Sequence, residues 1–179
     1  MRRRAKIVGA AALLGLIVCF CWEFLQLSRR IPPLAPIDAR ATSIIVEKRA
    51  RRMSLMRNDT ILKTYEVSLG SDPVGHKQQE GDGRTPEGVY AIDFKNPRSR
   101  FHLALRISYP DTKDRDSARR RGVSAGSDIM IHGLPNGIGW LRSLHLQRDW
   151  TDGCIAVTNA EVEEIWSVVD TGTTVQIKP

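Results

Sequence analysis

Residues 149–156 have the sequence Asp-Trp-Thr-Asp-Gly-Cys-Ile-Ala, in which a glycine directly precedes Cys154. A second element, Ile-His-Gly at residues 131–133, ends a short apolar run that follows Asp128. An imidazole beside a thiol can accept its proton and produce the thiolate, which is the nucleophilic form of cysteine. The two elements therefore predict a Cys154 nucleophile with His132 as its base.

The glycine before the cysteine has a predicted role of its own. We expect the backbone N–H groups of Gly153 and Cys154 to bind the oxyanion that forms when a carbonyl is attacked. A structural interpretation stays open for the pair, since a lone cysteine is often a small buried hydrophobic residue, and a histidine at a strand end often only forms hydrogen bonds. His145 is a rival base that lies nearer to Cys154 in sequence, but no glycine or strand pattern surrounds it.

The N-terminal segment predicts export. Residues 2–6 include four basic residues, and residues 7–22 are apolar without interruption, a pattern typical of a signal sequence. No Ala-x-Ala cleavage site follows, so we expect residues 1–28 to be a retained transmembrane anchor, with a cleaved or lipidated N-terminus as the alternative. The basic residues before the span favour an inner-membrane protein whose domain lies on the periplasmic side.

The charge of the chain is concentrated in the same segment. The formal net charge is +7, but residues 1–40 hold 7 of the 27 Lys and Arg and only 2 of the 20 Asp and Glu. The remainder is nearly balanced, so we expect no nucleic-acid partner. Cys19 and Cys21 lie in the apolar segment, which leaves Cys154 as the one cysteine of the exported part. A lone thiol in an oxidising compartment is prone to oxidation, which favours a function for it.

The rest of the chain predicts a linker and one domain. Residues 29–41 are rich in proline and predict an extended linker, and residues 42–179 are enough for a single domain. Helices are predicted at 114–121 and after Thr158, where Glu161 completes a capping box. Alternation and turn residues predict strands at 42–48, 52–56, 60–68, 88–93, 101–108, 128–131 and 173–177, with a loop at 70–88. The predicted fold is mainly β, a β-sandwich-like domain with two or three short helices.

Three motifs resemble those of the YkuD-type L,D-transpeptidase catalytic domain. The first is Lys-x-x-x-Gly-Asp-Gly-Arg-Thr-Pro-Glu-Gly-x-Tyr at residues 77–90, and the others are the Ile-His-Gly and Gly-Cys-Ile elements. The resemblance extends over nearly all of the exported part. It implies that Cys154 is the acylated nucleophile, that His132 is the base, and that the backbone carbonyl of Gly133 orients the imidazole.

Two positions depart from the family pattern. The family usually has Ser-His-Gly-Cys-[Val/Ile]-Arg, whereas here Asp152 replaces the histidine and Ala156 replaces the arginine; the stretch is more similar to a YafK-like subgroup. A substrate carboxylate then needs another partner, since guanidinium groups suit bidentate binding of carboxylates. Arg84 is equally well explained as a salt-bridged loop residue, and the tryptophans as core residues. The candidate substrate-binding residues are Arg84, Trp140, Arg148, Trp150 and Asp152.

The resemblance implies an envelope enzyme that acts on peptidoglycan stem peptides. Cys154 would attack the carbonyl of the third residue and form a thioester as the terminal D-alanine leaves. An amine or a protein acceptor then makes this a transpeptidation for crosslinking or remodelling the cell wall. Water makes the same site a carboxypeptidase or an amidase, and a non-catalytic envelope-binding domain is a third hypothesis. No cofactor or metal is expected, because the histidines and Cys154 lack metal-ligand spacing.

Overall fold

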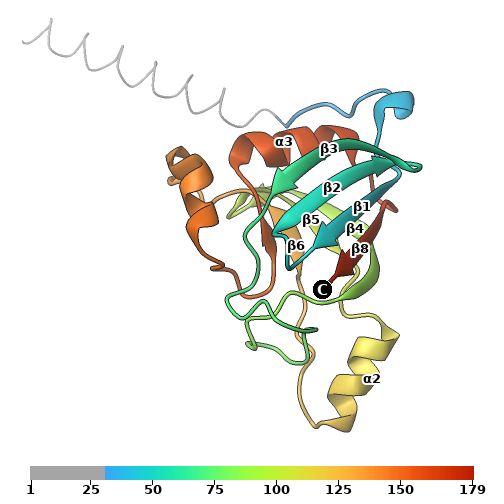
Figure 1. Cartoon of the computed structure of the whole chain (residues 1–179), viewed down its shortest axis with the longest axis vertical. Helices are drawn as coiled ribbons and strands as arrows, with labels where there is room; N and C mark the ends of the chain where they lie inside the picture. The colour runs from blue at the N-terminus through green and yellow to red at the C-terminus, as the bar shows by residue number, and fades with distance from the viewer. Residues whose placement is uncertain (1–30) are drawn as a thin grey trace, which may run out of the picture. The chain divides into compact units, whose positions relative to one another are not determined.

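An eight-stranded sheet forms the framework of residues 31–179, which are the residues that the computed structural model describes (Figure 1). The order across the sheet is β3-β2-β1-β8-β4-β5-β6-β7. The strands are β1 (Ser43–Glu47), β2 (Arg52–Arg57), β3 (Thr60–Glu66), β4 (Gly88–Ser99), β5 (His102–Ile107), β6 (Met130–His132), β7 (Ile155–Ala156) and β8 (Thr174–Lys178). The predicted anchor at 1–28 lies outside these residues, and no helix within residues 31–179 is long and apolar enough to cross a membrane.

The mainly-β prediction is confirmed, but the two layers come from one continuous sheet instead of two. Strands β1–β3 cross in front of β5 and β6 in Figure 1. The two ends of the sheet meet where Ser68, just after β3, exchanges backbone hydrogen bonds of 3.0 and 2.8 Å with Ala156 of β7. A second bridge joins Gly70 and Thr151. The sheet is therefore bent back on itself, and its closure lies at the predicted nucleophile.

Apolar side chains fill the space inside the bent sheet. Burial alternates along β1, and β6 and β7 place Ile131 and Ile155 in the core with no exposed surface. Strand β4 is longer than the predicted 88–93 because Pro97, which usually ends a strand, lies within an irregularity of the ladder between Asn96 and Ser99. The bulge removes the need for the proline to donate a ladder hydrogen bond.

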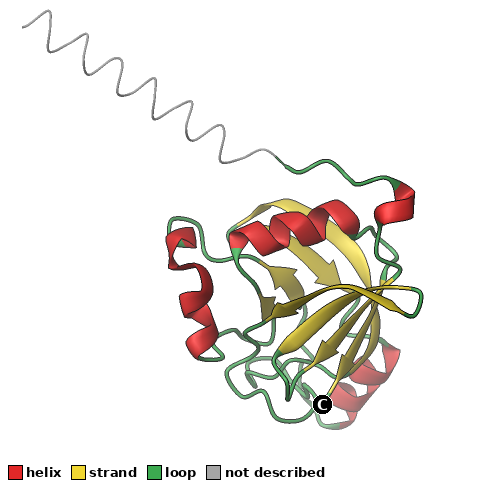
Figure 2. Cartoon of the chain, turned by 45° about the horizontal axis from the view of Figure 1, so that its top comes forward, coloured by secondary structure: helices red, strands yellow, loops and turns green. Residues whose placement is uncertain are grey.

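Four short helices accompany the sheet: η1 (Ile37–Ala39), α2 (Thr112–Arg120), η2 (Gly139–Gln147) and α3 (Asn159–Val168). Helix α3 packs against β5 and β6 and covers one side of the sheet in Figure 2. The capping box of Thr158 and Glu161 is present as predicted. The 3-10 segment η2 was not predicted, since it has no helical periodicity and is kinked at Arg142, whose φ is 45°.

The predicted linker is partly attached to the domain. The N–H groups of Ala35 and Ala41 donate to Ser167 and Val168 at the end of α3, and Arg40 forms a 2.8 Å ion pair with Asp170. The second half of the predicted linker is thus fixed to the end of α3 by backbone hydrogen bonds.

The loop between β3 and β4 has few regular elements but is held by a buried lysine. Lys48 is 2% exposed, and its ammonium donates to Glu87 Oε1 and Thr85 O at 2.8 Å each, and to Gly75 O. Three acceptors match the three N–H groups of an ammonium. Thr85 in turn accepts a hydrogen bond from Gly70 N–H through its hydroxyl. The loop therefore has a fixed path across the end of β1.

Replacing Lys48 by methionine should destabilise the domain strongly, since it leaves Glu87 and two carbonyl oxygens without their donor. We expect the free energy of unfolding to fall by about 3 kcal/mol, measured by urea denaturation. Lys63→Met is the matched control, because the pair of Lys63 with Glu164 is about half exposed and should contribute less than about 1 kcal/mol. Equal losses in the two variants would contradict this account of the loop.

Candidate active site

The parallel pairing of β6 and β7 brings the two predicted catalytic residues together. His132 lies opposite Ala156 in this register, and Cys154 precedes Ala156 by two residues. Alternate residues of a strand face the same side, so the side chains of Cys154 and His132 lie on one face of neighbouring strands. The thiol is directed at Asp128 O, 3.6 Å away, and makes no hydrogen bond to His132 in the described part of the chain. Loose contacts of this kind are common in active sites without substrate.

The hydrogen bonding of His132 fixes its tautomer. Its Nδ1 lies 2.6 Å from Gly133 O, and since a carbonyl only accepts, Nδ1 carries the proton and Nε2 carries the lone pair. The side chain is 3% exposed, packed against Phe101 and Trp150 with ring centroids 4.5 and 5.9 Å away. Burial lowers the pKa of His132 to about 4, and the hydrogen bond to Gly133 only partly opposes this. The imidazole is therefore neutral at pH 7, with a free base nitrogen.

Gly133 has no room for a side chain. A Cβ there would lie 2.7 Å from Asn159 Oδ1 and 3.1 Å from Phe101 O, and its N–H donates to Phe101 O and Leu103 O. The Asn159 amide, at the start of α3, also accepts from Leu134 N–H at 2.8 Å. The carbonyl that orients His132 is thus held between β5 and α3.

The thiol is protonated in the resting site. Burial raises the pKa of Cys154 to about 11, with the Asp152 and Asp128 carboxylates adding to the rise, while a backbone hydrogen bond with Met130 and the charge of Lys77 oppose it. The resting pair is consequently a neutral thiol and a neutral imidazole. Transfer of the thiol proton to His132 is unfavourable in this resting state, because the thiol has the higher pKa of the two groups.

Thr151 closes the turn that carries the nucleophile. Its hydroxyl donates to Cys154 O at 2.8 Å and accepts from Gly153 N–H at 3.1 Å. Gly153 N–H, one of the two predicted oxyanion donors, already donates within the turn. Cys154 N–H has no acceptor among residues 31–179 and remains as the candidate donor. Gly153 instead serves packing: its φ is 121°, and a Cβ would lie 2.4 Å from Arg84 O.

A buried lysine next to this turn was not predicted as a site residue. Lys77 is 3% exposed, and its ammonium lies 2.8 Å from Asp82 Oδ1 and 3.4 Å from Asp152 O. Although burial raises the pKa of Asp82, the bonds from Lys77 and from three backbone N–H groups of the same loop hold it at about 2. Both residues belong to the motif at 77–90, but their spacing alone does not show that the loop reaches the nucleophile.

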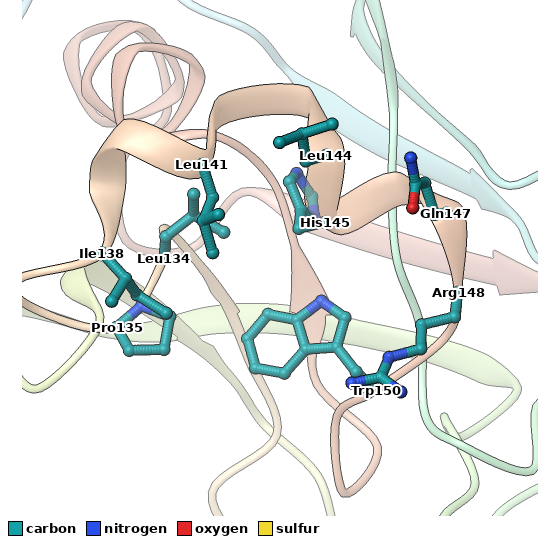
Figure 3. Close-up of a pocket in the computed structure, with 9 residues that line it drawn as sticks. All are labelled: Leu134, Pro135, Ile138, Leu141, Leu144, His145, Gln147, Arg148 and Trp150. Carbon is teal, nitrogen blue, oxygen red and sulfur yellow. The ribbon is translucent and has the colours of Figure 1, made fainter.

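A pocket of about 530 Å³ lies beneath residues 138–148 (Figure 3). Trp150 lines the pocket and also packs against His132. Two of the predicted substrate-binding residues, Arg148 and Trp150, line it. The full lining is Leu134, Pro135, Ile138, Leu141, Leu144, His145, Gln147, Arg148 and Trp150.

The other candidate binding residues do not line the pocket. Arg84 donates to Asp72 at 3.2 Å, in agreement with a salt-bridged loop residue. Trp140 is 71% exposed on η2. Asp152 touches the site through its backbone carbonyl, which accepts from Lys77.

His145, the alternative to His132 as the base for Cys154, lies in the wall of the pocket. It is buried there, and its Nδ1 lies 3.0 Å from Ser68 Oγ. No strand register places it next to Cys154, whereas the β6–β7 pairing does this for His132. Within residues 31–179, no three His, Cys, Asp or Glu side chains are grouped to hold a metal ion.

Two comparisons with known sequences point to the same family. Residues 41–177 match the family model of the YkuD L,D-transpeptidase catalytic domain. A curated relative from Escherichia coli K12, named "Putative L,D-transpeptidase YafK", is 32% identical over 111 residues, which are 61% of this chain. Those residues are 37% of the relative, so the chain matches little more than a third of its length.

Solved structures with the same fold include a cell shape determining protein and an L,D-transpeptidase. The helical cell shape determining protein Pgp2 from Campylobacter jejuni aligns with a TM-score of 0.56 and 25% identity, over 83% of this chain and 51% of that one. An L,D-transpeptidase from Mycobacterium smegmatis aligns with a TM-score of 0.51 and 14% identity, over 78% and 59%. The fold, the motif order and the family match over residues 41–177 agree: this chain belongs to the YkuD family of L,D-transpeptidase catalytic domains.

Proposed function

We propose that this protein is an L,D-transpeptidase that forms a thioester on Cys154 with peptidoglycan stem peptides. The observation that supports it most directly is the parallel register of β6 and β7, which sets Cys154 beside a neutral His132 whose Nε2 has a free lone pair. This arrangement suits acyl transfer by a cysteine and a general base.

The proposed first step is attack of the Cys154 sulfur on the carbonyl of the third stem residue. His132 Nε2 takes the thiol proton as the S–C bond forms, and the carbonyl oxygen becomes an oxyanion near Cys154 N–H. The C–N bond then breaks, and the imidazolium returns the proton to the departing amine. The products are a thioester on Cys154, a neutral imidazole and free D-alanine.

In the second step, His132 deprotonates the incoming nucleophile as it attacks the thioester. An amine restores an amide bond and completes a transpeptidation, whereas water gives a carboxypeptidase or an amidase. The likeness to Pgp2, named a helical cell shape determining protein, supports a part in shaping the cell wall. We further propose that residues 1–28 anchor residues 42–179 to the inner membrane on its periplasmic side.

Acylation is tested by intact-protein mass spectrometry of the full chain after incubation with a disaccharide tetrapeptide. We expect a mass gain equal to the donor minus D-alanine, together with free D-alanine. Cys154→Ala should abolish both, and His132→Ala should reduce the rate by roughly 100-fold or more. Repeating the reaction with an acceptor amine then separates transpeptidation from hydrolysis.

Thr42→Ala, a substitution far from Cys154 in a surface turn, is the matched control and should behave like the parent chain. An unmodified protein and an intact tetrapeptide, in a sample that circular dichroism shows to be folded, would rule out the proposed donor reaction.

The pH dependence should report the buried imidazole. His132 must be neutral to accept the thiol proton, so lowering the pH through its pKa of about 4 protonates it and stops acylation. We expect the acylation rate to stay level from neutral pH to about pH 5 and to fall below it, measured as kcat/KM. An acid limb near 6.5, the value for an exposed histidine, would contradict the neutral buried base.

The Lys77 ammonium should lower the pKa of the Cys154 thiol. Lys77→Met removes that charge, so the thiol pKa rises and the thiolate fraction at a given pH falls, by about tenfold for each unit. Alkylation of Cys154 by iodoacetamide at pH 8, followed on the peptide that contains it because Cys19 and Cys21 can also react, should slow accordingly. Lys77→Arg keeps the charge and should retain most of the rate. An unchanged alkylation rate in a folded Lys77→Met protein would show that this charge does not act on the thiol.

A further inference from the structure

Two buried ring nitrogens in the pocket beneath residues 138–148 have no hydrogen-bond partner. His145 Nε2 and Trp150 Nε1 make no such bond within residues 31–179, and both side chains line the pocket. His145 is only 9% exposed. Buried polar atoms in proteins are nearly always paired. Two of them in the wall of one pocket therefore mark a place for a polar ligand.

The contacts of Ser68 show which role His145 plays. The Ser68 hydroxyl lies 2.9 Å from His145 O and 3.0 Å from His145 Nδ1. The carbonyl only accepts, so the single hydroxyl proton goes to it, and Nδ1–H donates to the Ser68 oxygen. His145 Nε2 is then an unprotonated acceptor in a side chain that lines the pocket.

The second nitrogen has the opposite role. An indole N–H only donates, so the pocket presents one donor, from Trp150, and one acceptor, from His145. In Figure 3 the indole nitrogen lies on the edge of the ring that faces His145, below the arch of residues 138–148. An amide group carries one N–H and one carbonyl oxygen, so a single amide can satisfy both, as a water molecule or a hydroxyl also can.

The pocket also has a cation. Arg148 lines it, is exposed, and forms no ion pair within residues 31–179, while its neighbour Asp149 pairs with Arg51 at 2.7 Å. The other candidate for carboxylate binding, Arg84, is paired with Asp72. Ala156, where the family usually has arginine, has no exposed surface and faces β6 and Ser68. Arg148 is thus the guanidinium available for a carboxylate.

We propose that this pocket binds a carboxyl-terminal peptide unit, with its amide between His145 and Trp150 and its carboxylate on Arg148. Leu134, Ile138 and Leu141 supply an apolar wall for its side chain. The link between this pocket and the reaction rests on the proposed function. In that function the His132 imidazole, which packs against Trp150, exchanges a proton with the leaving and entering amines. The pocket is then the site of the amine component, and its volume suits a unit larger than alanine.

The test is a ligand-observed NMR titration of the full chain carrying Cys154→Ala, which binds without reacting. The probes are N-acetylglycine, its neutral form N-acetylglycinamide, and butanoate, which has the carboxylate but no amide. We expect N-acetylglycine to bind tightest. Arg148→Gln should weaken it by about 5- to 10-fold and equalise the acid and the neutral amide. Trp150→Phe should weaken both amides and leave butanoate unchanged.

Arg142→Gln is the matched control, because it removes the same charge from the same segment outside the pocket. If Arg148→Gln weakens N-acetylglycine no more than Arg142→Gln does, Arg148 does not bind the carboxylate and the proposal fails. If Trp150→Phe leaves the affinity for both amides unchanged, the two nitrogens are satisfied by water and the pocket does not recognise an amide. Neither outcome touches the acylation of Cys154, which is measured separately with reactive enzyme.

Discussion

The ion pair between Lys77 and Asp82 is the contact on which the candidate site depends most. Both side chains are largely buried, and a buried charge is tolerated only when it is paired and hydrogen-bonded. The Asp82 carboxylate gathers the backbone of its own loop, and the Lys77 ammonium extends from it to Asp152 O on the nucleophile turn. One pair thereby joins a loop without regular structure to the residue before Gly153, and it places a positive charge near the thiol.

Burial of the site also determines the resting protonation states of its two candidate catalytic groups. Desolvation raises the pKa of Cys154 and lowers that of His132, so both groups rest in their neutral forms. Oxidants and alkylating agents react with the thiolate. A thiol that stays protonated at rest is therefore protected from these reagents.

The sequence allowed prediction of those features that depend on neighbours along the chain. The cap at Thr158 follows from a local rule, and the Cys154–His132 pair was predicted from glycine-flanked motifs and their order. The hydrogen bond that occupies Gly153 N–H was missed, since it depends on the rotamer of Thr151. The position of Lys77 was missed for a related reason: its contact with Asp152 joins residues 75 positions apart.

The parallel pairing of β6 with β7 has a consequence for how such enzymes diversify. Two parallel strands cannot be joined by a tight turn and need a long crossover. Here the crossover, residues 133–154, contains η2 and supplies the whole lining of the pocket. The candidate catalytic residues thus lie at the strand ends, and the proposed binding pocket lies in the segment that joins them. Evolution, or an engineer, can exchange this insert to change the preferred partner while the reacting atoms keep their positions.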